Sequence, residues 1–123
     1  MLTAFLMGLL AIVGVITVAV VVVISGRWLI NYVKNKLKNR EKHKVAFADV
    51  REIVDDYIRN KVNNSEEISM EDLEKMCEET PYVAAVIDEE GEISEYEGFK
   101  SSKCSEKLKD TMKQEKGMII VGD

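Results

Sequence analysis

The chain has 123 residues and a net charge of −5, and it joins a long uncharged N-terminal segment to a strongly charged remainder. This length allows one small domain besides that segment. The acidic balance argues against binding to the phosphate backbone of nucleic acids, which rewards clustered positive charge, and two cysteines are too few for a disulfide framework.

Residues 2–25 contain no charged side chain, and the first one follows at Arg27. As a helix this segment would be about 36 Å long, against a hydrocarbon core of about 30 Å. It has no polar face, so the sequence predicts a transmembrane anchor over residues 1–26. A cleaved signal peptide is the alternative, but the segment lacks the basic start and the small-x-small cleavage site of such a peptide.

Small residues on one side of the predicted span provide a possible helix-packing stripe, because small side chains let membrane helices approach closely. They are Ala4, Gly8, Ala11 and Ala19.

Residues 27–44 carry seven basic side chains against Glu41 alone, and we expect a basic juxtamembrane helix. Lys and Arg beside a span are retained in the cytoplasm, which predicts an N-terminus outside and a cytoplasmic C-terminal domain. Aromatic and basic side chains suit the headgroup region. The predicted membrane-interface residues are Arg27, Trp28, Tyr32, Lys34, Lys36 and Lys38.

Residues 45–65 are predicted to form an amphipathic stalk helix followed by a turn at residues 63–65. Their apolar residues recur at three- and four-residue steps, which is typical of a helix with one buried face. The stripe would pack on the downstream domain or on a second copy as a short coiled coil. It consists of Phe47, Val50, Ile53, Val54, Tyr57, Ile58 and Val62.

Residues 66–123 are predicted to form a small acidic α+β domain. Ser69 can cap a short helix that Pro81 ends, and the apolar run 82–87 is typical of a buried strand. A turn at 88–91, an edge strand at 92–99, a helix capped by Ser101 or Ser102 and stopped by Gly117, and a strand at 118–121 complete the domain. The expected fold class is a single-span membrane protein with an N-terminal transmembrane α-helix, a helical stalk and a cytoplasmic domain ordered α-α-β-β-α-β.

Thirteen acidic side chains fall within residues 66–97, against Lys75 alone. They form either a solvated surface or a docking face for a basic partner. A calcium loop is not supported, because counting back from Gly91 places Val86 at the first ligand position. The possible partner face consists of Asp88, Glu89, Glu90, Glu92, Glu95 and Glu97.

The sequence offers little for catalysis. Its single histidine, His43, stands between Lys42 and Lys44, and no nucleophile, phosphate-binding or zinc motif is present. Cys77 and Cys104 fall on the apolar sides of predicted helices, so core packing is favoured over an enzyme that uses either thiol. No cofactor or metal site is predicted. A winged-helix fold is also disfavoured, because its DNA-recognition region would lie in the acidic block, which repels the phosphate backbone.

The sequence therefore predicts a membrane-anchored, cytoplasm-facing binding or scaffold protein without catalytic activity. Its expected partners are membrane lipid and a protein, for which a basic surface would suit the acidic face. Homo-oligomers through the span or stalk are expected, and nucleic acid is not. The alternative is a small membrane-active protein, holin-like or a phage accessory protein, acting through self-assembly of its transmembrane helix. The composition suits a bacterium or its phage.

Overall fold

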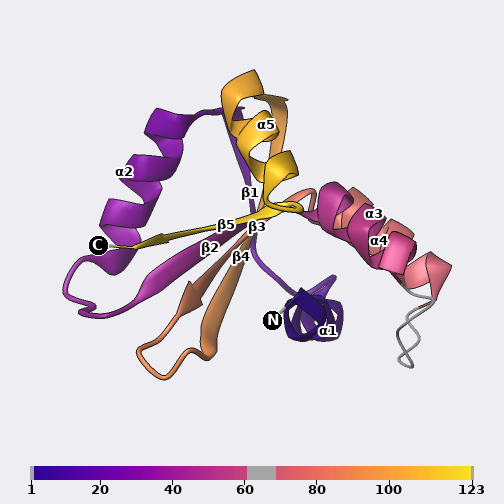
Figure 1. Cartoon of the computed structure of the whole chain (residues 1–123), viewed down its shortest axis with the longest axis horizontal. Helices are drawn as coiled ribbons and strands as arrows, with labels where there is room; N and C mark the ends of the chain where they lie inside the picture. Colours follow the sequence, from indigo (N-terminus) through magenta and orange to yellow (C-terminus); the bar gives the residue numbers. More distant parts are fainter. Residues whose placement is uncertain (1, 61–68, 123) are drawn as a thin grey trace.

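The computed structural model describes residues 2–60 and 69–122, which form a small α+β domain with five helices and a mixed five-stranded sheet (Figure 1). The elements in chain order are α1 (Leu2–Ile12), β1 (Val18–Ile24), α2 (Gly26–Leu37), β2 (Lys44–Asp49), α3 (Val50–Asn60), α4 (Met70–Glu79), β3 (Tyr82–Ile87), β4 (Ile93–Cys104), α5 (Glu106–Gln114) and β5 (Met118–Gly122).

The strand order in the sheet is β1-β4-β3-β2-β5. β1 is parallel to β4, whereas the other neighbouring strands are antiparallel. β1, β2 and β4 therefore run in the same direction. α2 connects β1, at one edge, to β2, so that the β3–β4 hairpin lies between the two strands that α2 joins.

Each face of the sheet has its own hydrophobic core, because side chains alternate along a strand. On β2, Val45 and Phe47 belong to the core under α2 and α5, whereas Ala46 and Ala48 belong to the core under α1, α3 and α4. Figure 1 shows the two groups of helices on opposite sides of the sheet. A strand covered on both faces must be apolar throughout, which explains the uninterrupted apolar run of β3.

Residues 2–25 do not form one helix, so the prediction of a transmembrane span is wrong. α1 ends at Ile12, Gly14 turns the chain with a φ of 92°, and β1 begins at Val18. Within the described residues, no helix combines the length and the apolar character that crossing a membrane requires. This finding overturns the single-span fold class and the placement of an outer N-terminus and a cytoplasmic C-terminal domain.

The valine content of residues 18–24 explains why a strand forms. Six of these seven residues are β-branched, and β-branched side chains lose rotamer freedom in a helix but pack well on a sheet. Parallel pairing with β4 satisfies the backbone N–H and C=O groups of β1. In lipid, these groups would have to bond within a helix. An apolar run is compatible with both structures, and hydropathy alone does not distinguish them.

The predicted stalk helix over residues 45–65 begins instead as the strand β2. The chain leaves α2 through Asn39 and Lys42, both at positive φ, and then joins the sheet. The predicted stalk stripe is divided between two elements, with Phe47 on β2 and the next buried side chains on α3. The buried α3 residues of the stripe are Val50, Ile53, Val54 and Tyr57.

From α3 onward the elements follow the order α-α-β-β-α-β, with β2 added ahead of them. Ser69 caps α4 by accepting a 3.1 Å hydrogen bond from the backbone N–H of Asp72. α5 is capped by Ser105 instead of Ser101 or Ser102. The turn predicted at residues 63–65 lies outside the described residues.

Candidate functional site

The exposed valines of β1 are the clearest candidate for an interaction site. The side chains of Val20 and Val22 are 82% and 78% exposed, and Val15, just before the strand, is 82% exposed. β1 is an end strand of the described sheet and pairs with β4 on one side. Proteins usually protect such edges with charges, prolines or bulges, yet residues 18–24 contain neither a charge nor a proline.

The length of β4 explains why β1 extends beyond the main sheet. β3 begins at Tyr82, opposite Phe99, whereas β4 continues to Cys104. Beyond Phe99, β4 therefore pairs with β1 in a two-stranded ribbon. Ala19 and Val21 pack against the core under α2 and α5, whereas Val20 and Val22, on the other face of the ribbon, are open to solvent.

The middle and the C-terminal end of β1 are fixed by the fold. Ile24 is fully buried at the end of the strand, and Ser25 begins α2 by accepting a 3.2 Å hydrogen bond from the backbone N–H of Trp28. Along the ribbon, the hydroxyls of Ser101 and Ser102 each donate to the Val22 carbonyl oxygen at 3.2 Å. These contacts hold β1 in an extended conformation at the edge of the sheet.

Part of the predicted acidic partner face is used within the domain. Glu95 Oε1 accepts a 2.9 Å hydrogen bond from Arg40 Nη1, and Lys36 Nζ lies 3.6 Å from Glu95 Oε1 and 3.4 Å from Glu97 Oε1. Burial opposes ionisation of Glu95, but the hydrogen bond from Arg40 and the neighbouring cations together lower the pKa of this carboxyl.

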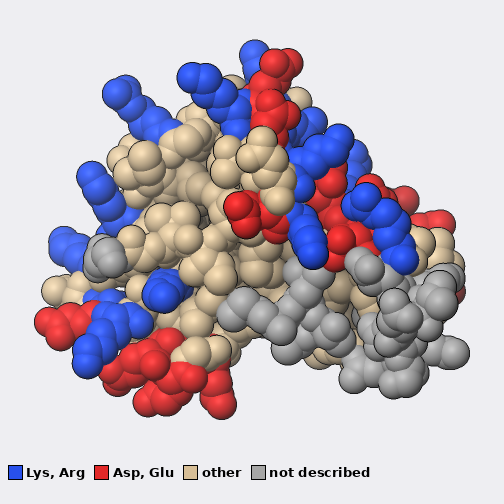
Figure 2. Space-filling model, viewed as in Figure 1, with Lys and Arg blue, Asp and Glu red and all other residues tan. Residues whose placement is uncertain are grey.

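The other acids of that predicted face occupy the β3–β4 turn. Asp88 Oδ1 accepts hydrogen bonds from the backbone N–H groups of Glu90 and Glu92, at 3.0 and 2.9 Å. Glu89, Glu90 and Glu92 are exposed. Figure 2 shows the acidic side chains gathered over this hairpin, whereas Lys and Arg gather over α2.

The predicted membrane-interface residues separate into an inner and an outer set. Trp28 packs against Phe47 and Phe99 and stacks on Tyr32, with ring centroids 5.8, 5.0 and 5.4 Å away. The Tyr32 hydroxyl donates to Glu97 Oε1 at 2.5 Å, and burial together with this bond raises the pKa of Tyr32. Lys36 belongs to the ion-pair network between α2 and β4.

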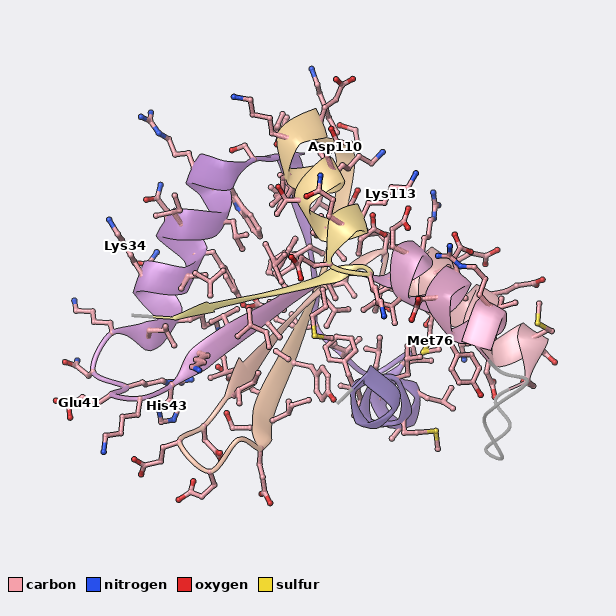
Figure 3. All side chains as sticks on the ribbon, in the orientation of Figure 1. Lys34, Glu41, His43, Met76, Asp110 and Lys113 are labelled. Carbon is pink, nitrogen blue, oxygen red and sulfur yellow. The ribbon has the colours of Figure 1, made fainter. Side chains whose placement is uncertain are left out.

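The outer set of α2 consists of exposed cations. Arg27, Lys34 and Lys38 are exposed, and Lys34 points away from the sheet in Figure 3. The helix is therefore basic on its outer side and aromatic on the side that faces the sheet.

The predicted small-residue stripe does not share one helix. Gly8 and Ala11 lie on α1, whereas Ala19 lies on β1 and packs against the core under α2 and α5. A Cβ at Gly8 would lie 2.3 Å from the hydroxyl oxygen of Tyr96, so this glycine allows α1 to approach β4. The side chain of Ala4 lies outside the described part of the chain.

In the part of the chain that the structure describes, neither cysteine thiol is activated as a nucleophile. Burial raises the pKa of both thiols, Cys77 and Cys104, and the nearby Asp49 carboxylate acts in the same direction. Burial also raises the pKa of Tyr82, which hydrogen-bonds Cys104, to about 12. These thiols stay protonated near neutral pH, which disfavours nucleophilic chemistry.

The remaining polar groups offer little to a metal or a small substrate. His43 Nδ1 lies 2.9 Å from the Glu41 carbonyl oxygen, in the loop between α2 and β2. Among the described residues, no group of three or more His, Cys, Asp or Glu is arranged to hold a metal ion. Surface depressions of about 210 to 480 Å³ are open to solvent, whereas small-molecule sites enclose most of their ligand.

No protein-family model, curated protein or solved structure matches this chain.

Sequence reasoning missed Val20 and Val22 as candidate site residues. The signal was present in the β-branched run of residues 18–24, which favours a strand. It was outweighed by the uncharged length of residues 2–25, which was attributed to lipid contact.

Proposed function

We propose that the protein is a non-enzymatic binding protein that adds an extended segment of a partner protein to its sheet along β1. The observation that carries this proposal is the exposure of Val20 and Val22 on an uncharged edge strand. In strand addition, main-chain hydrogen bonds supply affinity, and alternate side chains supply specificity.

The chemistry of β1 restricts the segment that it can bind. An arriving strand would cover Val20 and Val22, and burying an unpaired charge against them would be costly. The bound segment is therefore extended, uncharged and rich in β-branched or aromatic residues at its centre. Such residues give the favourable cross-strand pairs with valine.

The absence of catalytic action is part of the same proposal. The two thiols have raised pKa values, and His43 lies in a loop beside Lys42 and Lys44. The protonated thiols and the loop position of His43 agree with a surface that binds a partner and does not transfer protons.

Binding of defined peptides tests the proposal. The full chain is titrated into fluorescently labelled ten-residue peptides that have an uncharged β-branched centre and charged ends, and anisotropy is recorded. We expect wild type to bind, and the variant with both Val20→Lys and Val22→Lys to bind at least about tenfold more weakly. Hydrogen exchange of the β1 amides should slow when the peptide is present.

The matched control is Ile30→Lys, because Ile30 is 54% exposed on α2 and lies away from β1. This variant should bind like wild type. The proposal fails if monomeric wild type binds no such peptide, or if the β1 and α2 variants lose binding to the same degree.

A further inference from the structure

We infer that the strand that covers β1 is β1 of a second copy of this chain, paired antiparallel about a two-fold axis. The inference rests on the proposed function and names its partner. A segment that binds β1 has to be extended, uncharged and rich in β-branched residues. β1 itself fulfils these conditions, because its seven residues are uncharged and six of them are β-branched.

Two-fold pairing closes the exposed edge. When two identical strands pair antiparallel, each serves as the partner of the other, and neither β1 is left as an edge. The result is a continuous sheet through both copies. A heterologous pairing, such as β1 on the β5 edge of the next copy, would leave edges free and continue to grow unless the copies closed into a ring.

The charges nearest to β1 permit this pairing. Lys100 and Lys103 lie on β4, paired with Val20 and Val23. In the dimer the two β4 strands would be separated by both β1 strands, which is three strand spacings or about 14 Å. Because the Debye length is about 8 Å at physiological ionic strength, the lysines of the two copies are screened from one another.

The other edge of the sheet is a poorer surface for self-pairing. β5 has five residues, and its exposed side chain, Ile120, is 48% exposed. The Lys44 side chain lies against its last residue, since a Cβ on Gly122 would be 2.9 Å from Lys44 Cγ. A short edge strand is less open to self-pairing, whereas β1 has seven residues, of which Val20 and Val22 are 82% and 78% exposed.

The apolar contacts of the pairing come from residues that otherwise meet water. Val20 and Val22 would approach the same pair of residues on the other copy, and Val15 lies close to the start of each β1 strand. Cross-strand pairs of β-branched residues are favourable. In such a dimer these valines are buried, so the exposed apolar strand leads to a defined assembly and not to open aggregation.

Charge complementation tests the inference. The full chain is studied by sedimentation equilibrium as wild type, as Val20→Lys with Val22→Lys, and as Val20→Glu with Val22→Glu. We expect wild type to form a dimer, and the dimer dissociation constant of each charged variant to be at least about tenfold higher than that of wild type. An equimolar mixture of the lysine and glutamate variants should again form a dimer, whatever the register of the strands.

Two controls keep the result specific. Ile120→Lys places the same charge on the β5 edge and should leave the dimer intact, and the emission of Trp28, the single tryptophan, checks that each variant is folded. Restored pairing in the mixture also excludes misfolding as the reason for dissociation.

Each contrary outcome has its own meaning. A wild-type chain that is monomeric but binds the uncharged peptides overturns self-pairing and leaves the proposed function standing, whereas a monomer that binds no peptide overturns both. Growth beyond a dimer, or a dimer that Ile120→Lys dissociates and the β1 variants do not, overturns pairing through β1 about a two-fold axis.

Discussion

At the scale of single residues, Gly117 combines an unusual backbone with a close neighbour. Its φ is 98°, and a Cβ there would lie 2.8 Å from Ile53 N and 2.9 Å from Ile53 Cγ1. Gly117→Ala adds the left-handed strain of about 1 kcal/mol to an overpacking cost of about 1–3 kcal/mol. We expect the free energy of unfolding, measured by urea denaturation, to fall by about 2–4 kcal/mol.

Gly91 provides the matched control. Its φ is 82°, but a Cβ there would meet nothing within 4 Å. Gly91→Ala should therefore cost only about 1 kcal/mol, from the backbone alone. Equal losses at the two glycines would contradict the close approach of α3 to residue 117.

Asp49 should make stability depend on pH in an unusual direction. The residue is only 8% exposed, and burial raises the pKa of its carboxyl above the ordinary value of 3.8. Between that value and the raised one, the folded state binds more protons than the unfolded state, so stability falls as pH rises. Asp49→Asn keeps an acceptor for the Arg51 N–H and should be more stable than wild type at pH 7, with the gain lost below pH 3.8.

Glu95 should show the opposite sign, because its contacts with Arg40 and Lys36 lower the pKa of its carboxyl below the ordinary 4.5. Its contribution is present above pH 4.5 and is lost as pH falls through the lowered pKa. Glu95→Gln should therefore be less stable than wild type at pH 7, by less than about 1 kcal/mol, because the pair is partly exposed. Urea titrations of both variants across this pH range would contradict the assignments if the two effects had the same sign.

At the scale of elements, α1 should behave as a packing helix with one buried side. Leu9 is fully buried against the sheet, whereas Met7, on the same helix, is 43% exposed. Leu9→Ala should lower the free energy of unfolding by about 2–5 kcal/mol, and Met7→Ala by about 0.5 kcal/mol or less. Similar effects of the two substitutions would show that α1 does not pack in this orientation.

Local signals predicted several elements because the relevant interactions are close in sequence. The capping of α4 by Ser69, the buried strand β3 and the stop at Gly117 each follow from a few neighbouring residues. The strand β2 was missed because Phe47 also fits the three- and four-residue spacing that continues through Val50 and Ile53. Burial on both faces of a sheet, which requires distant strands, decided the outcome.

The candidate site was less predictable than the fold elements. Edge position is a property of strand order, and the order β1-β4-β3-β2-β5 joins residues that are far apart in the chain. The acidic residues show the same limitation, because the ion pairs of Glu95 and Glu97 with Lys36 and Arg40 form only once β4 and α2 have packed together.

At the scale of the whole molecule, the two cores should unfold together. β2 and β3 contribute alternate side chains to both cores. If the packing of one core is lost, these strands are disrupted and the other core loses the sheet against which it packs. Trp28 lies on the α2 face and Leu9 on the α1 face, which makes the tryptophan a reporter on the opposite side of the sheet. Leu9→Ala should therefore shift the urea midpoint of Trp28 emission by the same amount as the midpoint of far-ultraviolet circular dichroism. A shift in circular dichroism with an unchanged Trp28 midpoint would mean that α1 unfolds separately, and β1 would then have to be held at the sheet edge by β4 and α2 alone.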